Sequence, residues 1–216
     1  MSSIINATTT NGLKLQPDNS GSLVLQTNNG TTALTIDTSQ NATFAGTLTG
    51  TSFTGSGSGI TGVIKSSTAV ASTSGTSITF TGIPSWVKRI TVMYSSLSTN
   101  GSSSTQVQLG TSGGLTTSGY LSGYVYSGGS TGGGNLTTGL FVSSTSPADT
   151  RHGTVTITNI TGNTWVSTTV NGQSNNNYAQ FGGGSIALSG ALTQLAINMA
   201  NGTDVFDSGT INILYE

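Results

Sequence analysis

The stretch Asn11–Gly46, NGLKLQPDNSGSLVLQTNNGTTALTIDTSQNATFAG, decides how the first part of this chain folds. Large aliphatic residues occur here in pairs with one residue between the two members, and the pairs recur about every ten residues. Residues two apart lie on the same side of a β-strand, so each pair predicts one short strand with one apolar face. Asn28-Asn29-Gly30 lies between two of the pairs and predicts a tight turn.

The apolar stripe of this repeat is too thin to form a core within one chain. A repeat of about ten residues is shorter than a helical solenoid unit and indicates stacked strands. Three copies wound about one axis would bury the stripe and leave no open sheet edge. We therefore predict that residues 11–54 form an intertwined trimeric β stalk. Its trimer-core candidates are Leu13, Leu15, Leu23, Leu25, Leu34 and Ile36.

The composition excludes several classes of function. Charged residues make up 5% of the chain and the net charge is -1, against a usual charged fraction of about 25%. Five basic residues in 216 cannot form a patch for nucleic acid or for an anionic membrane surface. No apolar stretch approaches the length of a membrane span, and there is no cysteine. We expect no nucleic-acid binding, no membrane insertion and no disulfide.

Small polar residues dominate, since 40 Thr, 33 Ser, 32 Gly and 17 Asn account for 122 of the 216 residues. Disordered chains combine high net charge with few β-branched or aromatic residues, and this chain shows the opposite. Threonine, valine, isoleucine and tyrosine favour strands, while glycine and asparagine favour turns. The composition predicts an all-β protein made of many short strands.

A Gly/Ser-rich stretch at residues 55–63 predicts a linker, after which the texture of the sequence changes. Residues 64–216 hold both tryptophans and all six tyrosines. About eight to ten antiparallel strands are expected there, arranged as a β-sandwich head, jelly-roll-like in form. Turns are predicted at Asn100-Gly101, Thr161-Gly162-Asn163, Asn171-Gly172 and Asn201-Gly202. The predicted strands lie at 89–94, 105–109, 120–126, 154–158, 164–170, 185–190, 195–199 and 211–215.

Candidates for catalysis or metal binding are few. The only histidine, His152, follows Asp149 and Arg151. A local Asp149–Arg151 contact is preferred there to a catalytic role, because serines are too common to mark a nucleophile. Asp204 and Asp207 lack the regular oxygen spacing of a calcium loop and predict a turn. No metal and no cofactor is expected.

Two glycine-rich segments lack the context of a phosphate-binding loop. Residues 128–135, GGSTGGGN, are followed by no helix and no lysine, and predict a long flexible loop. The glycines at 182–184 precede the run SIALSG and predict a bulge or a close approach of another chain segment.

Tyrosines and asparagines near these segments are candidates for carbohydrate binding, which needs aromatic faces and planar polar groups. The alternative is that the tyrosines pack in the core and the asparagines form a turn, and it is favoured for any single residue. The receptor-contact candidates are Tyr124, Tyr126, Asn175, Asn176, Asn177 and Tyr178, with Tyr120 as a further aromatic.

The Asn11–Gly46 repeats resemble those of tail-fibre and related fibre proteins of tailed bacteriophages, particularly marine ones. SWVKRITVMYSSLST (85–99), TITNITGNTWVSTT (156–169) and DVFDSGTINILYE (204–216) resemble the C-terminal head of the same proteins. The resemblance implies a homotrimer on the virion surface, exposed to the medium. Residues 1–10 would attach to a tail or capsid protein, and the distal head would meet the host surface. The resemblance carries no receptor-contact residues over to this chain.

We expect a non-enzymatic virion fibre that attaches the phage to a host surface glycan or protein. A capsid fibre or decoration protein is the alternative of the same architecture. A polysaccharide-degrading spike is the enzymatic alternative, and it would need paired acidic residues in a groove, in a chain with six carboxylate side chains. A threonine-rich ice-binding sheet is a fourth possibility, suggested only by the TVTIT run at 154–158.

Overall fold

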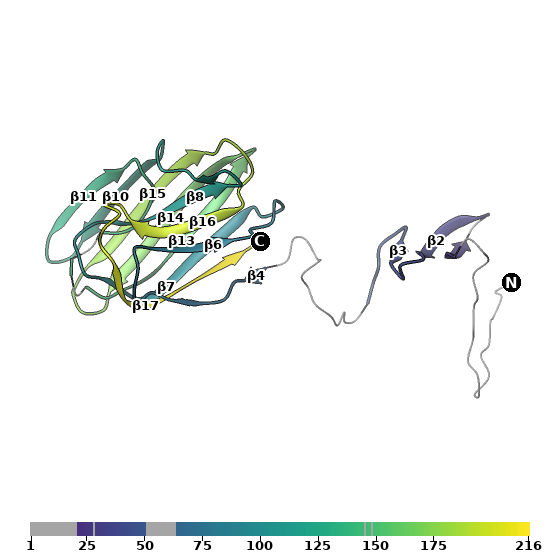
Figure 1. The fold of residues 1–216 in the computed structure, drawn as a ribbon, viewed down its shortest axis with the longest axis horizontal. Coiled ribbons are helices and arrows are strands. Elements are labelled where there is room, and N and C mark those ends of the chain that lie inside the picture. The colour runs from purple at the N-terminus through teal and green to yellow at the C-terminus, as the bar shows by residue number, and fades with distance from the viewer. Residues whose placement is uncertain (1–20, 28, 51–63, 145, 148) are drawn as a thin grey trace, which may run out of the picture. The chain divides into compact units, whose positions relative to one another are not determined.

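The computed structural model describes residues 21–27, 29–50, 64–144, 146–147 and 149–216. The chain divides into two compact units, Met1–Ser56 and Gly57–Glu216, which we call the N-terminal and C-terminal units. In the described part of both units all regular secondary structure consists of β-strands, and all strand pairs are antiparallel (Figure 1). The prediction of an all-β chain with antiparallel sheets is confirmed. The expected linker at 55–63 lies outside the described residues.

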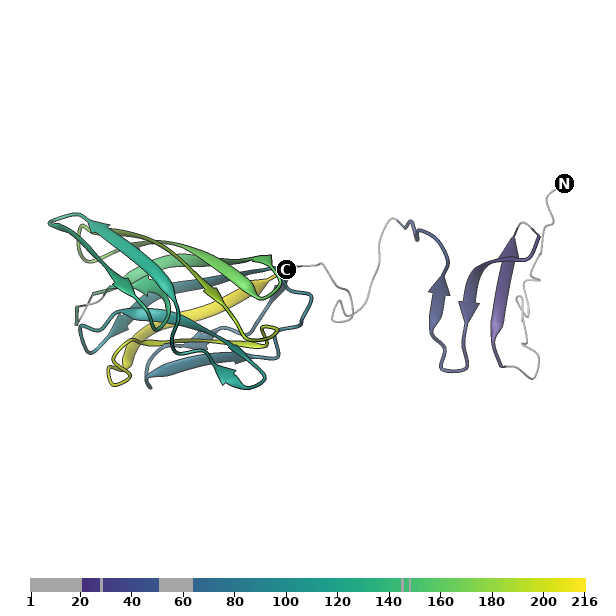
Figure 2. The same ribbon diagram turned by 90° about the horizontal axis from the view of Figure 1, so that it is seen from above.

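The N-terminal unit contains one three-stranded sheet, in the order β1-β2-β3 (Figure 2). Leu25 lies opposite Leu34, and Leu34 lies opposite Phe44. Opposed residues of antiparallel strands point to the same side of the sheet, so the apolar pairs gather on one face. Leu23 and Ile36, also opposed, extend this face. The strands are β1 (Leu23–Thr27), β2 (Thr31–Ile36) and β3 (Ala42–Phe44).

The two turns of this sheet follow from their sequences. Asn29 and Gly30 both adopt positive φ, 57° and 87°, which asparagine and glycine tolerate best. Between β2 and β3, Asp37 Oδ1 accepts hydrogen bonds from the backbone N–H groups of Ser39 and Asn41, each at 2.9 Å. The Asn41 side chain also donates to Asp37 Oδ2 at 3.0 Å. These hydrogen bonds lower the pKa of Asp37 below its ordinary value, and the bond from the Asn41 side chain has the largest effect.

A single copy of the N-terminal unit buries none of its described residues. Leu25 and Phe44 remain 43% and 44% exposed on the apolar face. The predicted strands around Leu23, Leu25, Leu34 and Ile36 are therefore present, while trimerisation stays a prediction. Leu13 and Leu15 lie outside the described residues.

The C-terminal unit is a sandwich of two antiparallel sheets. The larger sheet has the order β11-β10-β15-β14-β13-β7-β17-β4, with β5 also paired to β17. Its strands are β4 (Lys65–Ser66), β5 (Val70–Ala71), β7 (Arg89–Thr99), β10 (Leu121–Ser127), β11 (Thr131–Leu136), β13 (Arg151–Thr161), β14 (Thr164–Gln173), β15 (Ala179–Ala187) and β17 (Phe206–Tyr215).

The smaller sheet has the order β12-β8-β16-β6, with β9 paired to β8. Its strands are β6 (Ser77–Thr81), β8 (Thr105–Thr111), β9 (Gly114–Leu115), β12 (Leu140–Ser143) and β16 (Gln194–Met199). All eight predicted runs lie wholly or partly on strands. The sheets hold nine and five strands, more than the eight of a jelly roll, so the coarser prediction of a β-sandwich is the one confirmed.

The core lies between the two sheets and follows the alternation of the strands. On β13, Val155 and Ile157 are fully buried, while Thr154, Thr156 and Thr158 alternate with them on the other face. On the smaller sheet, Leu109, Leu195 and further aliphatic side chains complete one hydrophobic cluster. This unit thus has a core of its own within one chain.

The glycine-rich segment 128–135 is mostly not the predicted flexible loop, because residues 131–136 form strand β11. Glycine is needed there for space. A Cβ on Gly132 would come within 2.4 Å of the Tyr126 hydroxyl, and one on Gly134 within 3.0 Å of the Tyr124 hydroxyl. The predicted close approach at 182–184 is confirmed, since a Cβ on Gly182 would lie 2.7 Å from the Phe141 ring.

The predicted turn at Asn171-Gly172 is wrong, because both residues lie inside β14 and pair with β13 and β15. Asn171 is buried and its side-chain Nδ2 donates to the carbonyl oxygen of Val142 at 2.8 Å. This asparagine therefore connects a strand of the large sheet to β12 and does not reverse the chain. The connection between β14 and β15 is shorter than expected and covers residues 174–178.

Candidate functional site

A pocket of about 390 Å³ brings together four of the six predicted receptor-contact residues. It lies between the β10–β11 hairpin, the 174–178 connection and the segments that flank β8 and β12. The predicted residues in its wall are Tyr124, Tyr126, Asn176 and Tyr178. The other lining residues, which the sequence did not indicate, are Ser102, Ser104, Ser130, Ser144, Ser146, Asp149, Gln173 and Gln180.

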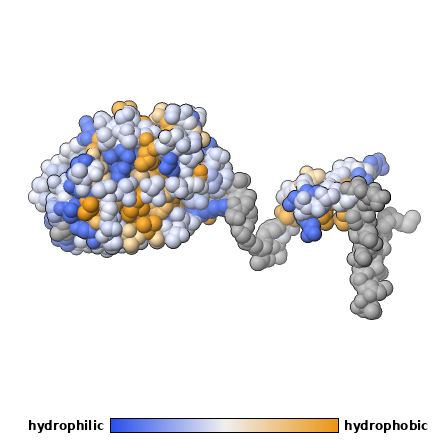
Figure 3. Space-filling view, in the orientation of Figure 1, coloured by the Kyte–Doolittle hydropathy of each residue, from blue (hydrophilic) through white to orange (hydrophobic). Residues whose placement is uncertain are grey.

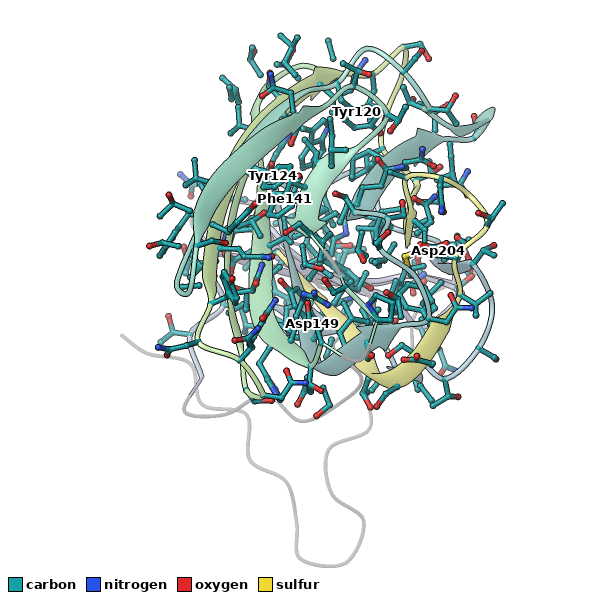
Figure 4. The ribbon with its side chains drawn as sticks, turned by 90° about the vertical axis from the view of Figure 1, so that its left-hand side faces the viewer. Tyr120, Tyr124, Phe141, Asp149 and Asp204 are labelled. Atoms are coloured by element: carbon teal, nitrogen blue, oxygen red, sulfur yellow. The ribbon has the colours of Figure 1, made fainter. Side chains whose placement is uncertain are left out.

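Tyr124 is held in place by a stacked partner. Its ring lies parallel to that of Phe141, with centroids 3.9 Å apart and planes 3° from parallel (Figure 4). Gly134 on β11 and Gly182 on β15 are its cross-strand neighbours, and the absence of their side chains makes room for the two rings. Sequence reasoning missed Phe141, although the aliphatic residues beside it could have indicated the strand β12.

Tyr126 and Tyr178 meet edge to face, with ring centroids 6.1 Å apart. The Tyr178 hydroxyl lies 3.1 Å from the Ser130 hydroxyl, which joins the 174–178 connection to the turn after β10. Gly128 allows this approach, because a Cβ there would lie 1.9 Å from the carbonyl oxygen of Asn177. Two segments about 50 residues apart in sequence thus form one wall of the pocket.

The three consecutive asparagines have different positions. Asn176 lines the pocket, and its side-chain oxygen accepts a hydrogen bond from the Asn177 N–H at 2.8 Å. Asn175 accepts a hydrogen bond from the Thr150 N–H at 2.9 Å and so braces the connection against the segment before β13. Tyr120 is fully buried, and its hydroxyl accepts a hydrogen bond from the Leu109 N–H at 2.8 Å. Asn175, Asn177 and Tyr120 are therefore not part of the pocket lining.

An ion pair between Asp149, which lines the pocket, and Arg151 supports the pocket wall. Arg151 is 0% exposed, and its Nη2 donates to Asp149 Oδ2 at 2.5 Å. The same oxygen accepts hydrogen bonds from the Ser146 N–H at 3.1 Å and from Gln173 Nε2 at 3.2 Å. The predicted Asp149–Arg151 contact is confirmed. Loss of the carboxylate would leave a buried guanidinium without its partner, which is costly.

Burial dominates the electrostatics around this pair. Desolvation lowers the pKa of Arg151, and the nearby charge of Asp149 opposes that change. Desolvation raises the pKa of Tyr94 well above its ordinary value. Arg151 Nε and Gln173 Oε1 are buried without a hydrogen-bond partner among the described residues. They belong to residues that face each other across β13 and β14.

His152 is placed by serines on both sides. Its Nδ1 accepts a hydrogen bond from the Ser96 N–H at 3.2 Å and lies 3.2 Å from the Ser95 hydroxyl. Its Nε2 lies 3.1 Å from the Ser174 hydroxyl. The backbone donor to Nδ1 assigns the proton of the neutral ring to Nε2. In the described part of the chain no carboxylate hydrogen-bonds to His152, so a Ser-His-acid arrangement is not formed around it.

The predicted turn at Asp204 and Asp207 is present only in part, because Asp204 lies in the connection between β16 and β17 whereas Asp207 lies inside β17. Asp204 Oδ2 accepts a hydrogen bond from the Ser103 N–H at 2.9 Å, and Oδ1 accepts one from Asn201 Nδ2 at 2.8 Å. These hydrogen bonds lower the pKa of Asp204, and the bond from Asn201 has the largest effect. Nowhere in the described ranges do three His, Asp or Glu side chains gather as metal ligands would.

The sequence matches no protein-family model and no curated protein. Among the residues that the structure describes, no helix has the length and apolar character needed to cross a bilayer. Function is therefore inferred from the chemistry of the pocket and from the contrast between the two units.

Proposed function

We propose that this protein is a non-enzymatic fibre of a tailed-phage virion that attaches, as a homotrimer, to a glycan on the host-cell surface. The observation that carries the proposal is the pocket, in which three tyrosines, an asparagine and several serines from distant segments converge. Its volume of about 390 Å³ falls in the range of roughly 300–1,000 Å³ that is typical of small-ligand sites.

The lining fits a sugar in kind. Tyrosines offer flat apolar surface with a hydroxyl at the edge, which suits a sugar ring with apolar C–H groups and polar rims. Asn176, Gln173 and the serine hydroxyls are groups that can both donate and accept hydrogen bonds, as sugar hydroxyls do. Recognition on the loops of a rigid β-sandwich also matches the position of this pocket at segment junctions.

The homotrimer is supported by the N-terminal unit. Its apolar face, formed by Leu23, Leu25, Leu34, Ile36 and Phe44, lacks any buried residue in one copy. A small sheet with one open apolar face is marginal in water by itself. Three copies around an axis would cover all three faces at once. Three pockets on one fibre would then raise a weak affinity per site by avidity.

The experiment that tests this function compares two aromatic variants of the full chain. Tyr178→Ala removes a pocket ring from the 174–178 connection, whereas Phe181→Ala removes an aromatic side chain that lies on the following strand β15, is 48% exposed and lies outside this pocket. We expect Tyr178→Ala to lower binding to a glycan array and to host cells at least about tenfold, and Phe181→Ala to leave both unchanged.

The result depends on the oligomer, so native mass spectrometry accompanies each binding measurement. Equal binding by both variants, with trimers intact, would contradict receptor binding by this pocket and favour the capsid-fibre alternative.

A further inference from the structure

We infer that the pocket selects neutral saccharides and rejects acidic ones, an inference that rests on the proposed function. Asp149 is the one formally charged residue in the described lining. A phage receptor could equally be an acidic glycan, with carboxylate, sulfate or phosphate groups, so the charge of the wall separates two classes of ligand.

One oxygen of the Asp149 carboxylate, Oδ1, can still accept a hydrogen bond. Three donors, Ser146 N, Gln173 Nε2 and Arg151 Nη2, all bond to Oδ2. No described group donates to Oδ1, and the side chain is 18% exposed. An ionised carboxylate only accepts hydrogen bonds. A sugar hydroxyl can donate to it, whereas a carboxylate or a sulfate on the ligand would bring a second negative charge without a proton.

Among the described residues of the lining there is no cation that could contact an acidic ligand. Arg151 pairs with Asp149 from the buried side: it is 0% exposed and is not part of the pocket lining, so a ligand meets the carboxylate and not the guanidinium. The other three basic residues of the C-terminal unit lie elsewhere: Lys65 over the Trp86 ring, Lys88 beside Asn159 and Arg89 beside Glu216. Binding of acidic groups characteristically uses Arg or Lys in bidentate or point-charge contacts, and this wall offers neither.

The chain as a whole carries little charge, since charged residues make up 5% of it. Figure 3 shows the visible face of the C-terminal unit mostly in pale colours, with separate strongly hydrophobic and strongly hydrophilic patches between them. Affinity must then come from stacking and from hydrogen bonds between uncharged groups. Such binding should change little with salt, because there is almost no exposed charge to screen.

The test uses matched saccharide pairs as probes for the full-length trimer. Methyl glucoside and methyl galactoside are compared with their uronic-acid counterparts at pH 7 by saturation-transfer NMR, at 50 and 500 mM salt, with ~tenfold as the threshold for discrimination. We expect at least one neutral member to bind, its acidic counterpart to bind at least about tenfold more weakly, and Tyr178→Ala to abolish the signal.

A gain-of-function variant makes the inference independent of one ligand pair. Ser102 is exposed in the pocket wall, and Ser102→Arg would add the missing cation. Ser189→Arg adds the same charge at an exposed position outside the pocket and serves as the control. We expect the acidic saccharide to gain binding of about tenfold or more with Ser102→Arg alone.

The outcomes separate the inference from the proposed function. Binding of an acidic saccharide as tight as that of its neutral counterpart, lost in Tyr178→Ala, would overturn neutral selectivity while glycan binding stood. No binding of any saccharide on a broad array, together with host adsorption that is unaffected by Tyr178→Ala, would overturn both.

Discussion

The two units of this chain are both rich in threonine, serine, glycine and asparagine, but only the C-terminal unit encloses a core. The C-terminal unit buries a continuous aliphatic cluster between two sheets, with Ile90, Val92, Val155 and Ile157 all fully enclosed. The described part of the N-terminal unit forms regular strands and turns but encloses nothing. Alternation of apolar and polar residues is thus enough to specify strands, whereas a second layer decides whether a sheet can be stable alone.

The largest effect is expected from a charge on the open apolar face of the N-terminal sheet. Leu25 and Val24 are both 43% exposed and adjacent, but they point to opposite faces of β1. We expect Leu25→Asp to cost roughly 3–5 kcal/mol per chain of trimer stability, because each copy would bury an uncompensated charge. Sedimentation would then show monomers. Val24→Asp should leave the trimer intact, and equal behaviour of the two variants would remove the apolar face from the trimer axis.

A cavity in the C-terminal core should have the converse effect. Ile157→Ala removes a fully buried side chain, which costs about 2–5 kcal/mol in the free energy of unfolding. Ile160→Ala, on the same strand but 61% exposed, should cost little. Calorimetry is expected to show a lower melting temperature for the C-terminal unit in Ile157→Ala alone, with the oligomeric state unchanged. Dissociation of the trimer by Ile157→Ala would show that the units are not independent.

High pH should distinguish the units because all six tyrosines lie in the C-terminal one. Burial raises the pKa of Tyr120 from 10.0 to about 12. Between these values the folded state keeps a proton that the unfolded state loses, so stability falls as pH rises through this window, by roughly 2–3 kcal/mol in total. Denaturant titrations at pH 9 and pH 12 should show the loss. Tyr120→Phe should reduce this dependence without removing it, because burial also raises the pKa of Tyr94. An unchanged slope in Tyr120→Phe would contradict the contribution of Tyr120.

The smallest expected effect concerns the wall of the pocket. Gly128→Ala would push the turn after β10 away from Asn177 and Tyr178, because a Cβ at Gly128 overlaps with both. We expect saccharide binding to weaken about tenfold, equivalent to roughly 1.4 kcal/mol, together with a lower melting temperature, because the atoms that the Cβ meets belong to the backbone. Gly113→Ala is the matched control, since a Cβ there meets only Thr111 at 3.6 Å. Full binding by Gly128→Ala would show that the loop contact does not shape the site.

Much of the fold is readable from the sequence, because period-two alternation in β-branched residues is a local signal. The errors have local causes too. Asn171-Gly172 has the composition of a turn, but Asn171 stays in β14 and its Nδ2 donates to the carbonyl oxygen of Val142 across the sandwich. The glycines of β11 suggest flexibility, but they leave room for the rings of Tyr124 and Tyr126. Propensity scales do not record what lies on the neighbouring strand.

Part of the pocket lining can be named from the sequence, because residue type alone marks some of its members. Tyrosines offer aromatic faces and asparagines offer planar polar groups, so residue type alone marks Tyr124, Tyr126, Asn176 and Tyr178 as candidates. Gln180 is not marked in this way, since its role is set by three-dimensional contact: its Nε2 donates to the Ser144 hydroxyl at 2.7 Å and ties β15 to the end of β12. Phe141 and Asp149 approach the site from segments that only the folded chain brings near.

The serine rim of the pocket has a consequence for how such a protein can change. Ser102 and Ser146 line the pocket from exposed positions, and their hydroxyls make no hydrogen bond to any other described residue. The rings, glycines and ion pair beneath them carry the architecture. Replacements at the rim therefore alter what is recognised without disturbing what folds. Under the proposed function, a change of ligand would need only single substitutions at these positions, with the scaffold kept intact.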